Sequence, residues 1–419
     1  MAIGLRRVLL LLLLMAAVPA AAAQSRAVVT DIPYASDHPS QVFDWYPTPV
    51  ASGSVPCVVF VHGGGKDGSS SKAQVTQGLH GDILALLLDN GISVMSVEFH
   101  PFPAFIYPVQ VEDSATAMQF IRANAANYDI DPDRLFAWGH SGGANIVGLL
   151  AYGPDRADPL GDPVEQQSSR PAGFLNSKGL SAWTLMVSGY PAPQFGQPTL
   201  ATVPLAVLND ASFTWHVTNT PRAFTPPVAS LFGSDENPPP LINPHDVTMM
   251  KTFHAALDAF PAEAALSIQL QDPIPPGGLP NEWSMALWAM ERFGLDHQLN
   301  IGDALAGTGG VTPLLWATGD FSTGGAFTLS LQASVAQPVT LWLLVGADYL
   351  GQPFKGGTLV TDPFLTLPLP SDANGQLVLP GILPPGLNPG DRTYLQFWNA
   401  DAVAPVGLAG SNGVLLQIE

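Results

Sequence analysis

A serine between glycines is the first residue whose setting suggests covalent chemistry. Gly139-His140-Ser141-Gly142-Gly143 fits the pattern G-x-S-x-G, between an apolar run, Leu135 to Trp138, and a helical pattern that begins at Ala144. Glycines on both sides let a chain turn sharply from a strand into a helix and hold a serine hydroxyl above the sheet. The helix N-terminus then stabilises negative charge beside that hydroxyl. The context therefore favours a nucleophilic serine over a chance match.

A run of glycines supplies a second part of such a site. His62-Gly63-Gly64-Gly65 follows directly after an apolar run that ends at Val61. Glycines allow backbone N–H groups to approach a substrate oxygen without obstruction by side chains. Together with the N–H of Gly142, these groups would stabilise an oxyanion. The alternative is a plain glycine-rich turn, but the serine motif downstream favours the functional interpretation.

Alternating elements must position these two motifs. Expected strands cover 57–61, 92–99, 135–138, 183–188, 228–232 and 265–270, after an early antiparallel strand at 43–47. Expected helices cover 80–89, 113–127, 143–151, 246–259 and 283–293. This alternation predicts that residues 31–296 form an α/β domain with a mostly parallel sheet. Two irregular, proline-rich segments, 152–182 and 189–227, would pass over the sheet's edge as a cap or substrate wall.

The pattern changes after residue 297. Phe327, Leu329 and Leu331 alternate with polar residues, a period of two that is typical of a half-buried strand. Further short strands are expected at 340–345, 358–361, 377–379, 393–398 and 414–418, with a turn at 372–375. We expect residues 298–419 to form a small all-β, sandwich-like module.

Composition excludes several function classes. The net charge of -19 leaves no basic face for nucleic acid. Hydrophobic residues make up 47% of the chain and charged residues 12%, which excludes disorder for most of it. A single cysteine, Cys57, allows neither an intramolecular disulfide nor a cysteine-based zinc site. No metal-ligand constellation stands out, so we expect no metal and no cofactor.

Residues 1–23 are typical of a signal peptide. Arg6 and Arg7 precede an apolar stretch, Val8 to Val18, and Ala21-Ala22-Ala23 offers a cleavage site before Gln24. The stretch is too short to span a bilayer comfortably. We therefore expect a secreted, periplasmic or cell-surface protein with no membrane span after cleavage. The alternative is an uncleaved anchor.

At these motifs the sequence resembles the α/β-hydrolase superfamily, in particular the HGGG-type carboxylesterases and feruloyl-esterase-like enzymes. The resemblance covers about residues 31–296 and rests on Phe43-Asp44-Trp45-Tyr46-Pro47, His62-Gly63-Gly64-Gly65, and Asp131-Pro132-Asp133-Arg134 leading into Gly139 to Gly143. It implies that Ser141 is the nucleophile and that Gly64, Gly65 and Gly142 donate to the oxyanion. It also implies that Asp235, just after the expected strand at 228–232, orients a histidine.

The histidine that the family carries after the last strand is missing. No histidine occurs between the expected strand at 265–270 and the helix at 283–293. His254 and His297 are expected far from the site. The four that follow strand ends are His62, His100, His140 and His245. We favour His245 as a displaced base, because the long loop at 236–244 could fold over the site. His100 is the next candidate. For His245 itself, the sequence favours the competing role of capping the helix at 246–259.

We therefore expect a secreted serine carboxylesterase with Ser141, Asp235 and His245 as catalytic residues. Its expected substrate is a small-molecule or polysaccharide-linked ester. Without a positioned base, a serine hydroxyl keeps its high pKa and attacks poorly. The alternative is consequently a catalytically impaired hydrolase-fold protein that binds a ligand or partner.

Overall fold

The computed structural model describes residues 27–49, 54–64, 71–232, 235–265, 267–271, 281–293, 295, 298–302, 304–388, 390–404 and 406–418. The expected signal peptide, residues 1–23, lies outside this range. The chain divides into two compact units, and the division falls between Ala289 and Met290, inside helix α8 (Asn281–Arg292). This point is a few residues ahead of the boundary expected near residue 297.

An eight-stranded sheet forms the centre of the first unit. Its order is β1 (Val29–Pro33), β2 (Val42–Tyr46), β4 (Ser93–Val97), β3 (Val55–Val61), β5 (Ile130–His140), β6 (Phe174–Ser177), β9 (Val228–Phe232) and β10 (Ile268–Gln271). The first three strands pair antiparallel, and every later pairing from β4 to β10 is parallel. The expected mostly parallel sheet is confirmed, including the early antiparallel strand.

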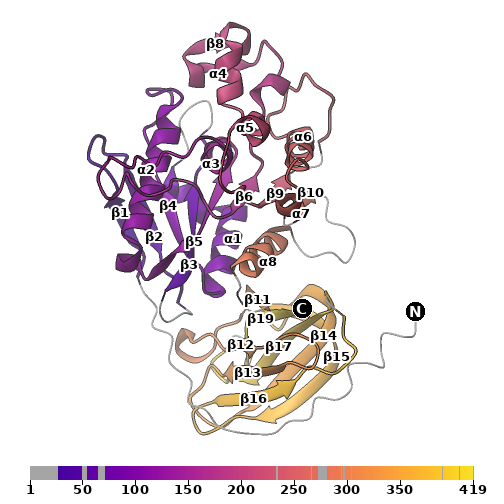
Figure 1. The fold of residues 1–419 in the computed structure, drawn as a ribbon. Coiled ribbons are helices and arrows are strands. Elements are labelled where there is room, and N and C mark those ends of the chain that lie inside the picture. Colours follow the sequence, from indigo (N-terminus) through magenta and orange to yellow (C-terminus); the bar gives the residue numbers. More distant parts are fainter. Residues whose placement is uncertain are drawn as a thin grey trace. The chain divides into compact units, whose positions relative to one another are not determined.

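Helices flank this sheet (Figure 1). The principal ones are α1 (Gly78–Asp89), α2 (Val109–Ala123), α3 (Gly142–Tyr152) and α6 (Val247–Leu257), followed by α7 (Pro261–Ala265) and α8. Helix α3 is buried from Gly143 to Tyr152, because small residues let it pack closely on the strands and on its neighbours. At Gly148, for example, a Cβ would lie 2.3 Å from the ring of Phe213. All five expected helices are present, with shifted ends.

One expected strand is wrong. Residues 183–188 do not join the sheet; Trp183–Leu185 forms a short 3-10 helix, η4. The strand at this place in the sheet is β6, whose Asn176 and Ser177 are fully buried. Two polar residues in four hide the strand from any hydrophobic pattern. They are tolerated because neighbours satisfy them: Asn176 Oδ1, for instance, accepts a hydrogen bond from Gly179 N at 3.0 Å.

The segment between β6 and β9 builds a cap with its own apolar cluster. It contains η4, β7 (Pro191–Ala192), η5 (Pro193–Phe195), β8 (Gln197–Thr199), η6 (Leu200–Thr202), α4 (Leu205–Asp210) and α5 (Phe213–Asn219). The cluster joins residues of this segment to Phe232, at the carboxyl end of β9, and to Val247, at the start of α6. The cap is therefore anchored at the strand ends where α/β proteins place their sites.

The second unit is a two-sheet β-sandwich. One sheet has the order β11 (Gln298–Gly302), β19 (Gly413–Gln417), β17 (Arg392–Ala400), β14 (Thr340–Phe354) and β15 (Gly357–Pro370), with β18 (Leu408–Gly410) beside β17. The other has the order β12 (Leu314–Gly319), β13 (Ala326–Gln332) and β16 (Gln376–Ile382). Inward side chains of both sheets share one core, among them Leu329 and Phe397. The all-β prediction is confirmed. No helix in the described part of the chain is long and apolar enough to cross a membrane.

Candidate active site

Ser141 occupies a strained turn between β5 and α3. Its backbone has φ 51° and ψ -116°, a conformation that non-glycine residues rarely adopt and that recurs at functional sites. The flanking glycines make this turn possible. A Cβ on Gly139 would lie 2.3 Å from Ala144 Cα, and one on Gly143 would lie 2.1 Å from Val61 O. The sequence pattern G-x-S-x-G is thus a steric requirement of this turn, which presents the serine at the carboxyl end of β5.

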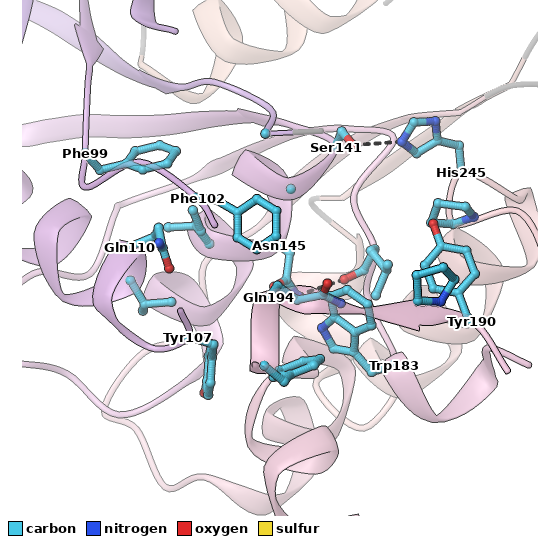
Figure 2. Close-up of a pocket in the computed structure, with 18 residues that line it drawn as sticks. Phe99, Phe102, Tyr107, Gln110, Ser141, Asn145, Trp183, Tyr190, Gln194 and His245 are labelled. Carbon is cyan, nitrogen blue, oxygen red and sulfur yellow. Dashed lines mark hydrogen bonds between the residues drawn. The ribbon is translucent and has the colours of Figure 1, made fainter. Parts of the chain in front are cut away.

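His245 lies against Ser141. A hydrogen bond of 2.8 Å joins Ser141 Oγ and His245 Nε2, and Figure 2 shows the imidazole pointing at the hydroxyl along the edge of the pocket. This is the geometry required of a nucleophile and its general base. Among the histidines of the described ranges, His245 is the one that contacts the hydroxyl.

The residue after His245 anchors the loop that carries it. Asp246 is fully buried and is the N-cap of α6, where its Oδ1 accepts a hydrogen bond from Thr248 N at 2.9 Å. The same carboxylate accepts from Asn237 N and Nδ2, which ties the start of the loop to its end. Helix capping therefore belongs to Asp246 and not to His245, so the imidazole is left to face Ser141.

Asp235 does not reach the imidazole. Its exposed carboxylate accepts a hydrogen bond from Asn243 Nδ2 at 3.1 Å. Asn243 Oδ1 in turn accepts from His245 N at 2.9 Å, so Asn243 links the aspartate to the backbone of the histidine. Within the described residues, no carboxylate is hydrogen-bonded to the His245 ring. The structure thus brings Ser141 and His245 into contact, whereas Asp235 is connected to His245 through Asn243.

The glycine loop after β3 runs beside the serine turn. A Cβ placed on Gly142 would lie 3.5 Å from Gly64 N, so these two backbones are neighbours, and both residues border the pocket. Gln74 holds the loop through its Oε1, which accepts a hydrogen bond from Gly63 N at 2.8 Å. The imidazole of His62, directly before the glycines, is held by Glu98, because His62 Nε2 pairs with Glu98 Oε1 at 2.7 Å. Gly64 and Gly142 thus lie side by side next to Ser141, and their role as oxyanion donors stays a prediction; Gly65 lies outside the described residues.

The other candidate histidines are engaged elsewhere. His100 Nδ1 pairs with Asp113 Oδ2 at 2.6 Å, and His100 does not line the pocket. His140 Nδ1 contacts Ser177 Oγ at 3.2 Å; burial, together with the nearby imidazoles and Lys178, lowers its pKa to about 3. His254 Nε2 contacts the buried Ser230 Oγ at 2.9 Å, and burial lowers its pKa to about 4. His297 lies outside the described residues.

Electrostatics keep His245 neutral. Burial lowers the pKa of its imidazole, and the charge of Lys178 lowers it further. A neutral imidazole is the form that accepts a proton, so the site is prepared for base chemistry at neutral pH. The same surroundings disfavour the imidazolium that such chemistry creates, and no described carboxylate offsets this effect. Among the described residues, no group of three or more His, Cys, Asp or Glu side chains is placed to hold a metal ion.

A cavity of about 330 Å³ opens beside Ser141 (Figure 2). It is lined mainly by apolar and aromatic side chains of the sheet edge, α2, α3 and the cap. The lining residues are Gly64, Phe99, Phe102, Tyr107, Gln110, Val111, Ser141, Gly142, Asn145, Ile146, Leu180, Trp183, Tyr190, Pro191, Gln194, Phe195, Pro244 and His245. Residues 189–227 therefore contribute to the wall of this cavity, through Tyr190, Pro191, Gln194 and Phe195. The segment 152–182 contributes only Leu180 to the lining.

The sequence does not reveal most of this wall. Trp183 falls in a run that predicts a strand, and Gln194 sits in a proline-rich stretch without a pattern. The sequence indicates the wall only indirectly: a long segment between two parallel strands is expected to pass over the carboxyl ends of those strands. Which of its side chains face the serine depends on the packing of the cap.

Comparison with known proteins supports this architecture. The BD-FAE family model matches residues 43–173, which include Ser141 and the glycine loop but neither Asp235 nor His245. The carboxylesterase NlhH of Mycobacterium tuberculosis is 31% identical over 118 residues, or 28% of this chain and 34% of NlhH. The probable isoprenylcysteine alpha-carbonyl methylesterase ICMEL2 of Arabidopsis thaliana is 26% identical over 143 residues, or 34% of this chain and 32% of that protein. The chain thus spans about a third of the length of these curated relatives.

Solved structures share the fold of the first unit. A truncated carbohydrate esterase from gut microbiota aligns with a TM-score of 0.51 and 19% identity, over 66% of this chain and 99% of that one. A bifunctional GH43-CE protein of Bacteroides eggerthii aligns with a TM-score of 0.50 and 20% identity, over 64% of this chain and 38% of that one. The sheet order, the serine turn after β5 and these likenesses together show that the first unit of the chain has the α/β-hydrolase fold.

Proposed function

We propose that this protein is a serine hydrolase of carboxylic esters, with Ser141 as nucleophile and His245 as general base. The observation that carries the proposal is the 2.8 Å hydrogen bond between Ser141 Oγ and His245 Nε2 at the mouth of an apolar pocket. The names of the matched relatives, a carboxylesterase and a probable methylesterase, support the same class of reaction.

The reaction follows from the geometry. His245 Nε2 takes the proton of Ser141 as Oγ attacks the ester carbonyl, and the N–H groups of Gly64 and Gly142 stabilise the resulting oxyanion. Gly65 is the third proposed donor. Collapse of this intermediate breaks the bond to the alcohol oxygen, which leaves with the proton from His245. Water, activated by the same imidazole, then attacks the acyl group and releases the carboxylic acid and free Ser141.

The proposed machinery is a pair and not a full triad. In a triad, the acid orients the imidazole and stabilises its charged form. Here Asp235 acts on the backbone of His245 through Asn243. We expect turnover to be slower than that of an enzyme with a carboxylate on the ring, because the imidazolium lacks that stabilisation.

The substrate class and location form part of the proposal. A cavity of about 330 Å³ accommodates a small apolar part of an ester, either a free molecule or a group attached to a polysaccharide. We propose that the chain is exported after cleavage near Gln24, on the strength of Arg6, Arg7 and the apolar stretch that follows. N-terminal sequencing of the exported protein tests the cleavage site; a start at Met1 would contradict it.

Covalent labelling tests the proposed reaction. The chain from Gln24 onward is treated with a fluorophosphonate, and the modified peptide is mapped by mass spectrometry alongside hydrolysis of 4-nitrophenyl acetate. We expect one adduct, at Ser141, and loss of hydrolysis in proportion to labelling, with Ser141→Ala as the control. The competing hypothesis, an impaired binding protein, predicts neither labelling nor turnover above that of Ser141→Ala.

A further inference from the structure

Two short helices of the cap form the wall of the pocket away from the catalytic pair. Trp183 begins η4, and Gln194 and Phe195 belong to η5. The rings of Trp183 and Phe195 meet edge to face with their centroids 5.1 Å apart, so the two helices are in contact. In Figure 2, Gln194 and Trp183 lie together across the pocket from Ser141 and His245.

This wall presents two buried hydrogen-bond donors that the protein does not use. Trp183 Nε1 and Gln194 Nε2 are both shielded from solvent and have no partner among the described residues. Trp183 is only 9% exposed, and its indole N–H can act only as a donor. Buried donors without an acceptor are unfavourable, and a ligand that supplies the acceptor is one explanation for them.

Three other polar side chains of the pocket already donate hydrogen bonds to the protein. Asn145 Nδ2 donates to Leu180 O and Ala211 O, both at 2.9 Å. Tyr107 Oη donates to Asp210 Oδ2 at 2.6 Å, and Gln110 Nε2 donates to Phe105 O at 2.8 Å. These bonds help to hold the cap in place, and the donor atoms that make them already have acceptors within the protein. Trp183 and Gln194 are therefore distinct from the structural polar contacts around them.

The other residues that line the cavity indicate which kind of ligand group would accompany an acceptor oxygen. Phe99, Phe102, Val111, Ile146 and Phe195 line the same cavity as Ser141, Trp183 and Gln194. Such a surface favours an apolar group, and it offers little to a charged one. A ligand that fits both features is apolar along its length and carries an oxygen acceptor at the end remote from the ester.

We propose that Trp183 and Gln194 are specificity-determining residues that select esters whose pocket-bound group carries an ether, hydroxyl or carbonyl oxygen remote from the scissile bond. The inference rests on the proposed hydrolase function for its kinetic consequence. A site that offers buried donors discriminates strongly against an analogue without the acceptor, because the donors then stay unpaired.

Matched esters test this directly. The first pair is the 4-nitrophenyl ester of 5-methoxypentanoic acid and that of heptanoic acid, which have acyl chains of equal length. The second pair, 4-methoxybutyl acetate and hexyl acetate, places the same difference on the alcohol side. After correction for the rates with hydroxide, we expect one pair to show at least about a tenfold preference in kcat/KM for the ether, since a buried polar site discriminates more strongly than an apolar one.

Three variants separate donation from packing. Trp183→Phe and Gln194→Met each remove a donor and keep much of the volume, so each should lower the ether preference severalfold. Phe195→Leu alters the same wall without touching a donor and should change both members of a pair alike. Equal rates for both members in both pairs, or an unchanged preference in Trp183→Phe, would overturn the proposal.

Binding to an inactive protein keeps the inference separate from catalysis. Titration calorimetry of Ser141→Ala with methyl 5-methoxypentanoate and methyl heptanoate, and with the two acetates, measures selection without turnover. An ether preference in binding supports the specificity site even if wild-type protein hydrolyses nothing, in which case the hydrolase proposal alone fails. Equal binding within both pairs would contradict the specificity site whatever the rates.

Discussion

Ser141 Oγ and His245 Nε2 are hydrogen-bonded at 2.8 Å although 104 residues separate them in the chain. The contact provides an imidazole at Ser141 in a chain whose loop after β10 contains none. The loop from β9 to α6 brings it there, with Asp246 fixing one end. The proposed base thus follows β9, whereas the resemblance to the family predicts a histidine after the last strand, β10.

The indirect role of Asp235 predicts a mild effect of its replacement. Asp235→Asn should lower kcat by about tenfold or less, whereas loss of a triad acid from the imidazole costs about 10⁴. Asn243→Ala removes the bond to His245 N and should cost more, about 10- to 100-fold, because small displacements of a catalytic group are expensive. Steady-state kinetics of both variants provide the measurement. A loss near 10⁴ in Asp235→Asn would mean that its carboxylate reaches the ring during turnover.

Lys178 should set the acid limit of activity. Burial and Lys178 both lower the pKa of His245, so the neutral base persists below the ordinary histidine value of about 6.5. The acid limb of kcat/KM should therefore have its midpoint below that value. Lys178→Gln removes a positive charge, raises the pKa of His245 and should shift the limb to higher pH. Lys251, which pairs with Glu236, provides the control, and Lys251→Gln should leave the profile in place. A shift to lower pH in Lys178→Gln would contradict the assignment.

Asp246 should couple stability to activity. Asp246→Ala removes the cap of α6 and leaves Thr248 N and Asn237 without their acceptor, which should cost about 1–3 kcal/mol of unfolding free energy. It should also lower kcat, because the loop that carries His245 loses its anchor. Denaturant unfolding and ester hydrolysis measure the two effects. The exposed Asp258 at the other end of α6 offers a control, and Asp258→Ala should change stability by about 0.5 kcal/mol or less. Full stability in Asp246→Ala would remove the basis for this anchor.

The first unit should fold and function without the second. A chain of residues 24–297 keeps the whole of α8 and should be a soluble monomer with undiminished kcat/KM. A chain of residues 24–280 loses α8, and with it the contact of Trp288 on Phe136, whose ring centroids are 5.7 Å apart. That shorter chain should be unstable. Size-exclusion chromatography and an ester assay compare the two. An aggregated or inactive 24–297 chain would show that the β-sandwich belongs to the catalytic unit.

The sequence predicts a strand that is apolar throughout, such as β3. It misses β6, whose polar residues can be buried only because other segments supply hydrogen-bond partners. β3 is wholly buried, and all of its residues are apolar, so the apolar pattern marks it. β6 carries Asn176 and Ser177, which are compatible with a core only because partners such as Ser230 Oγ, 3.3 Å from Asn176 Nδ2, come from a distant part of the chain. The run at 183–188 is apolar for another reason, since Trp183 and Met186 belong to the cluster of the cap.

The residues of the site also differ in whether local sequence or tertiary packing determines their positions. The turn around Ser141 can be predicted because Gly139 and Gly143 each answer a local steric demand. His245 can be proposed by its position after β9, but its distance from Ser141 depends on how a proline-rich loop folds. The orientation of Asp235 toward Asn243 has no signal in the sequence, because this contact also depends on how the loop folds. The pocket wall is equally a product of tertiary packing.

The most direct test of the account is a double-mutant cycle on Ser141 and His245. The full chain from Gln24, Ser141→Ala, His245→Gln and the double variant are compared by kcat/KM on 4-nitrophenyl acetate, with thermal unfolding as a check on folding. Because a nucleophile and its base act as a unit, we expect each single variant and the double variant to lose activity to a similar level, on the order of 10³-fold or more. A folded His245→Gln that retains kcat/KM close to that of the wild type would contradict the catalytic pair.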